Sequence, residues 1–168
     1  AHRGLSMPVV YNSNGYDSVR VLRLLDGIVD IYMPDLKYAQ PEAGCRLSAV
    51  EDYPRHARDA QVEMHRHVGD CWDLGPEGEL RRGLLVRLLV LPEGLGGVEA
   101  NLAWIARTLS PTVAISLLAQ YHPSHRVPGS ADFGDLDRAI SREDWQRAVA
   151  ALEKHMEGDR HHVQGVFL

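Results

Sequence analysis

Residues 84–91 read Leu-Leu-Val-Arg-Leu-Leu-Val-Leu, and this stretch is apolar throughout apart from Arg87. A continuous apolar run of this length is typical of a strand covered on both faces, as strands of parallel sheets are. Pro92 follows and ends the strand, because proline has no N–H to offer the ladder. The stretch therefore predicts one buried strand of an α/β sheet.

Further apolar, β-favouring runs flank this strand and alternate with segments of helical periodicity. The expected strands are Met7–Asn12, Ile28–Met33, Leu84–Leu91, Val113–Gln120 and Val163–Leu168. The expected helices are Val19–Leu25 after a cap at Asp17 or Ser18, Tyr53–Val68, Val98–Leu109, and Arg142–Met156 after a cap at Ser141 with Asp144 three residues on. Residues 71–82 contain the turn signal Gly75-Pro76-Glu77-Gly78, which predicts a small hairpin or a surface loop.

Alternation of strands and helices implies right-handed crossovers and a parallel sheet. The expected fold class is α/β, a partial (β/α) barrel of about five mainly parallel strands with flanking helices. A complete eight-stranded barrel usually takes ~250 residues, so we expect an arc that is open at its first strand. The 168 residues have the size of a single domain, residues 1–168.

The composition is that of a globular domain, with 45% apolar and 24% charged residues. A net charge of -5 without a Lys/Arg block argues against a nucleic-acid partner. No apolar run approaches the ~20 residues that cross a bilayer, so we expect no membrane span and a cytoplasmic protein. Cys45 and Cys71 lie far apart in expected loops, and we interpret both as free thiols.

Polar residues follow the expected strands at the end where parallel α/β sheets bind ligands. They form four clusters, 12–15, Asp35 with Lys37, 92–94, and 120–122. Because the carboxyl ends of parallel strands share one edge of the sheet, we expect Ser13, Asp35, Lys37, Arg87 and His122 to converge there.

Arg87 is the most informative single residue, because a guanidinium within an apolar strand is costly unless it is paired. We expect it to hold a ligand carboxylate or a carboxylate of the sheet such as Asp35. The alternative is an edge strand from which Arg87 reaches water.

Asp35 and Lys37 flank Leu36, so in an extended segment they point to the same side. They either bind a cation or a ligand, or form a structural ion pair. Tyr121 and His122 likewise either contact a planar ring or merely end a strand.

The expected helix 53–68 carries His56, Glu63, His65 and His67. Only Glu63 and His67 are four residues apart, so we interpret this group as a solvated face rather than a metal site. His155, His161 and His162 are likewise expected on the surface.

With these residues laid out, the chain closely resembles the radical S-adenosylmethionine (SAM) superfamily, specifically proteins similar to pyruvate formate-lyase activating enzyme. The segments that carry the resemblance occur in family order along nearly the whole chain. They are Val9-Val10-Tyr11-Asn12-Ser13-Asn14-Gly15-Tyr16, Tyr32-Met33-Pro34-Asp35-Leu36-Lys37-Tyr38, Gly83-Leu84-Leu85-Val86-Arg87, Leu91-Pro92 and Ala119-Gln120-Tyr121-His122-Pro123.

The resemblance implies that SAM binds along these strand ends. The implied cofactor-binding residues are Ser13, Asn14, Asp35, Lys37, Arg87, Tyr121 and His122. The implied cation site beside SAM consists of Asn12, Ser13, the Met33 carbonyl and Asp35. Asn12 stands where the activating enzymes have an aspartate, so this cation site lacks one negative charge.

The resemblance also shows what this sequence lacks. The family binds a [4Fe-4S] cluster through a Cys-x-x-x-Cys-x-x-Cys loop and grips the SAM amino group with a Gly-Gly-Glu segment, and neither motif occurs here. Cys45 and Cys71 cannot replace the triad, because a cluster needs several thiolates at one point. We therefore expect a carboxy-terminal portion of such a barrel, with no iron incorporation and weak SAM binding at best.

The complete enzyme would cleave SAM reductively to a 5′-deoxyadenosyl radical and abstract hydrogen from a partner, often a glycyl radical enzyme. This chain is not expected to be active without the cluster-binding part. Two alternatives stay open. Lys37 could form a Schiff base in an aldolase-like barrel, or the chain could be a non-enzymatic binding or scaffold domain that self-associates through its exposed edge.

Overall fold

The computed structural model describes residues 7–70, 73–159 and 161–164, and it contains one sheet of five parallel strands with a short antiparallel addition. The spatial order is β1-β2-β4-β5-β6, and β3 pairs with β4. The strands are β1 (Val10–Ser13), β2 (Ile31–Pro34), β3 (Asp73–Leu74), β4 (Leu80–Leu89), β5 (Ala114–Leu118) and β6 (His162–Gln164).

Helices lie between successive parallel strands along the chain. They are α1 (Val19–Leu24), α2 (Pro41–Ser48), α3 (Tyr53–Val68), α4 (Val98–Thr108) and α5 (Arg142–His155), with short 3-10 helices η1 (Pro92–Gly94) and η2 (Ala131–Leu136). Among the described residues, none of these helices is long and apolar enough to cross a membrane.

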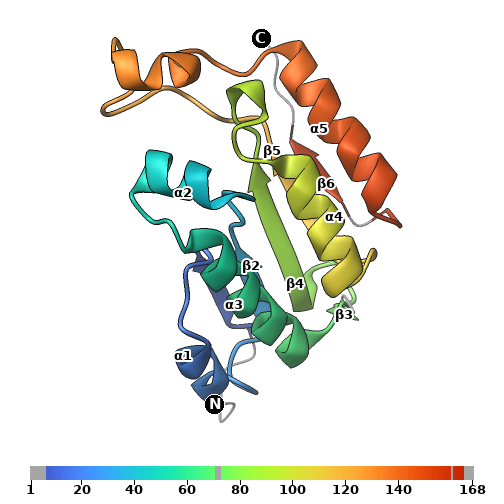
Figure 1. Ribbon diagram of the computed structural model, residues 1–168. Coiled ribbons are helices and arrows are strands. Elements are labelled where there is room, and N and C mark those ends of the chain that lie inside the picture. Colours follow the sequence, from blue (N-terminus) through green and yellow to red (C-terminus); the bar gives the residue numbers. More distant parts are fainter. Residues whose placement is uncertain (1–6, 71–72, 160, 165–168) are drawn as a thin grey trace.

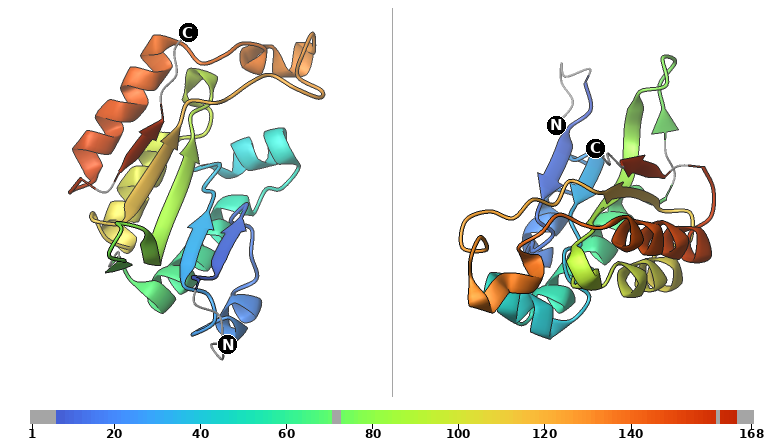
Figure 2. Two further views of the ribbon diagram at one scale, coloured as in Figure 1. Left: turned by 180° about the vertical axis from the view of Figure 1, so that it is seen from behind. Right: turned by 90° about the horizontal axis from the view of Figure 1, so that it is seen from above.

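The helices α3, α4 and α5 pack on one face of the sheet, and the opposite face is turned away from them (Figures 1 and 2). Alternation along β4 shows the same division, because Val86 and Leu88 are buried whereas Leu85, Arg87 and Leu89 are only partly covered. The main core thus lies between sheet and helices. We call the other side, which carries Arg87, the open face.

The predicted α/β sheet of about five mainly parallel strands is confirmed, and it does not close into a barrel. β1 is an edge strand that pairs only with β2 among the described residues, which agrees with an arc open at its first strand. The predicted hairpin is also present, because β3 pairs antiparallel with the start of β4.

Several boundaries differ from those expected. The second strand begins at Ile31 rather than Ile28, because Ile28 and Val29 still bond to Leu25 in the turn after α1. The sequence did not predict α2, and Cys45 lies on this helix rather than in a loop. Cys45 is a free, exposed thiol, whereas Cys71 and the end of the expected last strand, 165–168, lie outside the described residues.

The start of α5 follows its sequence signal closely. The Ser141 side chain accepts a hydrogen bond from the Asp144 N–H, and the Asp144 carboxylate accepts from the Ser141 N–H, which completes a capping box. The buried Asp144 carboxylate also pairs with Arg138 and Arg147, and it accepts the Glu93 N–H. This one residue therefore fixes both the helix start and the loop that follows β4.

Candidate functional site

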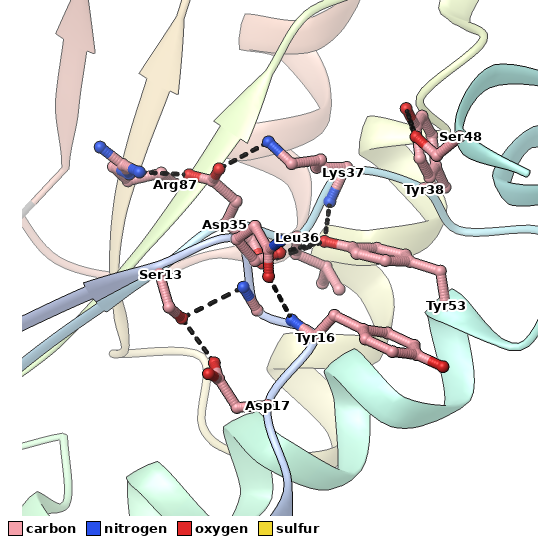
Figure 3. Close-up of polar contacts among 12 residues, drawn as sticks. Ser13, Tyr16, Asp17, Asp35, Leu36, Lys37, Tyr38, Ser48, Tyr53 and Arg87 are labelled. Carbon is pink, nitrogen blue, oxygen red and sulfur yellow. Dashed lines mark hydrogen bonds and ion pairs between the residues drawn. The ribbon is translucent and has the colours of Figure 1, made fainter. Parts of the chain in front are cut away.

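An ion triad of Asp35, Lys37 and Arg87 lies at the carboxyl end of β2 (Figure 3). One Asp35 oxygen is 2.6 Å from Arg87 Nη2, and the other is 2.6 Å from Lys37 Nζ. Asp35 and Arg87 also form an isolated parallel bridge between the two chain segments. The prediction that Arg87 finds a carboxylate such as Asp35 is confirmed. The edge-strand alternative is wrong, because β4 lies between β2 and β5.

The triad carries two cations around one carboxylate, so it has a formal charge of about +1. The side chains of Asp35, Arg87 and Lys37 remain 18%, 25% and 37% exposed, and a ligand could reach them. Arg87 Nε is buried and has no hydrogen-bond partner among the residues that the structure describes. An anionic ligand group would suit this cluster better than a cationic one, because it would neutralise the remaining charge.

Ser116, which the sequence did not single out, and His162, which was expected only as a surface residue, continue this row across the open face. Arg87 is the register partner of Ser116 on β5, and Ser116 is the register partner of His162 on β6. Side chains of register partners in neighbouring strands point to the same face. A guanidinium, a hydroxyl and an imidazole therefore lie side by side. Ser116 is the polar residue within the apolar stretch Val113–Leu118, and it is buried, at 5% exposure.

Tyr53 on α3 joins the loops that follow β1 and β2. Its hydroxyl accepts the Lys37 N–H at 2.9 Å and lies 2.8 Å from the Asn14 carbonyl, to which it donates. Burial raises the pKa of Tyr53, which keeps the hydroxyl protonated as a donor. Gly15 makes this closeness possible, since a Cβ there would lie 2.1 Å from the Asp35 carbonyl oxygen.

Ser13 and Asn14 do not join the triad. The Ser13 hydroxyl donates to Asp17 at 2.5 Å and accepts the Gly15 N–H, and Figure 3 shows it pointing away from Asp35. The Asn14 side chain accepts the Tyr16 N–H at 2.9 Å. The expected convergence of Ser13 with the triad is therefore wrong, because Ser13 comes one residue after Asn12 and faces the other side of the sheet.

Asp17 also accepts the Tyr11 hydroxyl at 2.8 Å. Burial and this carboxylate raise the pKa of Tyr11 to about 12. Tyr11 is the register partner of the fully buried Tyr32, so this group belongs to the helix-covered face.

The residues of the implied cation site do not suit a cation. Asn12 and its register partner Met33 share the open face with Asp35, whereas Ser13 lies on the other face. Both oxygens of Asp35, the only carboxylate of the set, already pair with Lys37 and Arg87. A metal ion would compete with two cations for one carboxylate, so we assign no metal to these residues.

A [4Fe-4S] cluster does not suit this chain either. The sequence holds two cysteines, and Cys45 lies on the exposed side of α2. The described residues contain no cluster of three or more His, Cys, Asp or Glu side chains that could hold a metal ion.

Tyr121 lies beyond the end of β5 and shares a pocket of about 520 Å³ with Lys37. Its hydroxyl donates to the Leu136 carbonyl at 2.9 Å, and its pKa is raised by burial first and by Asp137 and Asp135 second. His122 is exposed. The structure thus brings Tyr121 and Lys37 together, and it leaves His122 facing solvent.

The histidines of α3 differ from the expected solvated face. His67 and Glu63 are buried, at 6% and 7% exposure. His67 Nδ1 bonds to the Tyr32 hydroxyl at 2.8 Å, and His67 Nε2 lies 3.2 Å from Glu63. Arg66 adds an ion pair to Glu63. The prediction that Glu63 and His67 lie on a solvated face was wrong. Tyr32 provides a buried hydrogen-bond partner for His67, and the spacing of residues along a helix cannot reveal such a partner.

The remaining histidines are divided between surface and partial burial. His162 is exposed as expected, whereas His155 and His161 are partly buried. Burial lowers the pKa of His161.

Comparison with known proteins finds an archaeal relative of this chain. The chain is 29% identical over 151 residues to an uncharacterized protein of Methanocaldococcus jannaschii. The match covers 89% of this chain and 39% of that relative, so the chain spans about two fifths of the relative's length. No family model and no solved structure matches the chain.

Proposed function

We propose that this chain is the carboxy-terminal portion of a radical SAM activating-enzyme-like barrel, and that the open face of its sheet binds SAM. The observation that carries the proposal is the Asp35–Lys37–Arg87 triad, which joins the ends of two strands at distances of 2.6 Å. Asp35 and Lys37 belong to one segment of the family resemblance, and Arg87 belongs to another.

The chemistry of the triad suits the amino-acid end of SAM. Lys37 and Arg87 together exceed the charge of Asp35 by one, and the α-carboxylate of SAM would supply the missing anion. Tyr121, which follows β5 and shares a pocket with Lys37, would contact the nucleoside. Ser116 and His162 continue the polar row in the direction away from β2, but Ser116 is only 5% exposed, so of these two residues His162 is the one that a ligand could reach.

The reductive step would need a cluster from elsewhere in the protein, because the donors for it are not in this chain. When bound, a [4Fe-4S] cluster would supply the electron that cleaves SAM. In this proposal the described residues hold and orient SAM, and the chain alone is inactive. The greater length of the archaeal relative leaves room for such a part. By analogy with the activating enzymes, the proposed partner is a glycyl radical enzyme or another protein or small-molecule substrate.

Lys37 also allows the aldolase-like alternative. Against it, the Lys37 amine lies 2.6 Å from the Asp35 carboxylate, an arrangement that engages the charged ammonium rather than a nucleophilic amine. Borohydride trapping of a carbonyl substrate on Lys37 would favour the alternative over SAM binding.

Equilibrium dialysis with radiolabelled SAM tests the proposal. We expect weak, saturable binding that falls about tenfold or more in Arg87→Met, because one charge-assisted hydrogen bond contributes about 1.5–3 kcal/mol. Arg81→Met is the matched control, since Arg81 lies on the same strand but is 53% exposed beside Glu79 at the opposite end. Absence of saturable binding, or equal binding by Arg87→Met and the wild type, would contradict the proposal.

A further inference from the structure

A pocket of about 520 Å³ opens beside the triad, between α2 and the segment that contains η2. Figure 1 shows α2 beside the carboxyl end of β4 and the segment with η2 (orange) beyond it, at the end of the sheet where parallel α/β proteins bind their ligands. Lys37 is a member of both the triad and the pocket lining. A ligand in this pocket would therefore lie next to whatever occupies the triad.

Contacts between distant parts of the sequence hold the pocket walls together. Arg46 on α2 binds both carboxylate oxygens of Asp135 on η2, at 2.7 and 2.6 Å, and donates to the Asp132 carbonyl at 2.9 Å. Tyr121 also holds η2, through the hydrogen bond that its hydroxyl donates to the Leu136 carbonyl. The pocket is thus formed before any ligand arrives, which lowers the entropic cost of binding.

Among the described residues, the charged side chains that line the pocket are those of Lys37, Arg46 and Arg126, and none of them is a carboxylate. Asp35 balances Lys37, and Asp135 balances Arg46. Arg126 has no ion pair within the described part of the chain, and its guanidinium lies 5.9 Å from the centre of the Phe133 ring. The Arg126 guanidinium is therefore available to pair with an anionic ligand in the pocket.

The rest of the lining is largely apolar and aromatic. Leu47, Leu89, Leu91 and Phe133 contribute apolar surface. Among the polar groups, Tyr121 is already bonded to backbone. Such a lining suits a planar or apolar body, and the volume suits a small molecule rather than a folded partner.

We infer that this pocket binds a small organic acid with a planar or apolar body, whose carboxylate or phosphate pairs with Arg126. We further assign this acid as the substrate of the reaction, a step that rests on the proposed function. Because Lys37 borders both sites, the substrate would lie next to SAM. The chemistry shared by the two anion types is recognition by a guanidinium stacked on Phe133.

Isothermal titration without SAM tests the pocket with four probes: 3-phenylpropionate, phenyl phosphate, the neutral 3-phenylpropionamide, and inorganic phosphate. We expect one of the two aromatic anions to bind about tenfold more tightly than both the amide and inorganic phosphate. The stronger of the two anions identifies carboxylate or phosphate as the recognised group. Equal binding of anion and amide would overturn the inference.

Arg126→Gln should weaken the preferred anion about tenfold and leave the amide unchanged, whereas Arg20→Gln, an exposed change on α1, should alter neither. Unchanged anion binding by Arg126→Gln would overturn the site. The result is separable from the proposed function, because Arg87→Met should weaken SAM and retain the anion. If SAM fails to bind while the anion depends on Arg126, the pocket stands and the SAM proposal falls.

Discussion

The Asp35 carboxylate pairs with both Lys37 and Arg87, so we expect its removal to lower the free energy of unfolding more than the removal of either cation. Asp35→Asn would leave Arg87 and Lys37 facing each other without a counter-charge, whereas Arg87→Met would leave Asp35 still paired with Lys37. Removing one partner of a fully buried pair costs about 3–5 kcal/mol. Because the triad keeps some exposure to water, we expect about 2–3 kcal/mol for Asp35→Asn and about 1–2 kcal/mol for Arg87→Met.

A double-mutant cycle isolates the pair energies. Urea unfolding, followed by the fluorescence of the tryptophans, gives the free energy of unfolding for the wild type, for Asp35→Asn, Arg87→Met and Lys37→Met, and for the two double variants that combine Asp35→Asn with each of the others. The Asp35–Arg87 coupling should be about 1–2 kcal/mol. The Asp35–Lys37 coupling should be below about 1 kcal/mol, because the Lys37 side chain is the most exposed of the three.

The Glu79–Arg81 pair serves as the control, because its ion-pair distance of 2.7 Å is similar to that of the Asp35–Arg87 pair but its side chains are exposed to solvent. Its coupling should not be distinguishable from zero, because solvent screens it. If the Asp35–Arg87 coupling were no larger than that of this control, the interior ion pair would not exist in solution. The assignment of Arg87 as a site residue would then be refuted.

The remaining predictions concern stability, pH and assembly. Gly15→Ala should destabilise the protein by about 3 kcal/mol or more, because the new Cβ would meet the Asp35 carbonyl. Gly78→Ala has a similar φ but open space around it, and it should destabilise the protein by about 1–2 kcal/mol. Equal losses of stability in thermal unfolding would contradict the close approach of Gly15 to Asp35. Asp144→Ala should lower the free energy of unfolding in urea by about 2–3 kcal/mol. Glu143→Ala, on the exposed side of the same turn, should lower it by less than about 0.5 kcal/mol. Equal losses in the two variants would contradict the structural role of the Asp144 side chain. Burial would raise the pKa of Asp144, but the hydrogen bonds from the Ser141 backbone and Arg138 outweigh burial and lower this pKa to about 2. The ionised Asp144 should therefore contribute about 1–2 kcal/mol to the free energy of unfolding above its ordinary pKa of 3.8, and this contribution should disappear as the pH falls through about 2. Asp144→Asn should not show this loss of stability in acid. Among the described residues β1 pairs only with β2, so its other edge should give concentration-dependent self-association in sedimentation velocity. A strictly monomeric mass at high concentration would contradict this prediction.

Sequence reasoning predicted the strands and helices with strong periodic signals. The apolar run around Arg87 became β4, the polar helix after Asp52 was placed at Tyr53–Val68, and the Ser141–Asp144 signal marked the start of α5. These elements are decided by local patterns. The helix α2 was missed, because Pro41-Glu42-Ala43-Gly44 contains a proline and a glycine that usually read as loop.

The site was predictable in part for the same reason. A guanidinium in an apolar strand requires a partner, and the parallel topology limits the candidates to strand ends, which led to Asp35. The position of His67 could not be predicted, because it depends on Tyr32 from another element, which holds His67 in the core. The face of Ser13 follows from strand alternation, and there its hydroxyl donates to Asp17.

The most direct test of the central claim is a titration of ¹⁵N-labelled protein with SAM, followed by amide chemical shifts. The account predicts that the shifts concentrate on residues 34–37 and on Arg87, with smaller changes at Ser116 and residues 119–122. Shifts that are absent at saturating SAM, or that lie on the helix-covered face or at the β3–β4 turn, would contradict it.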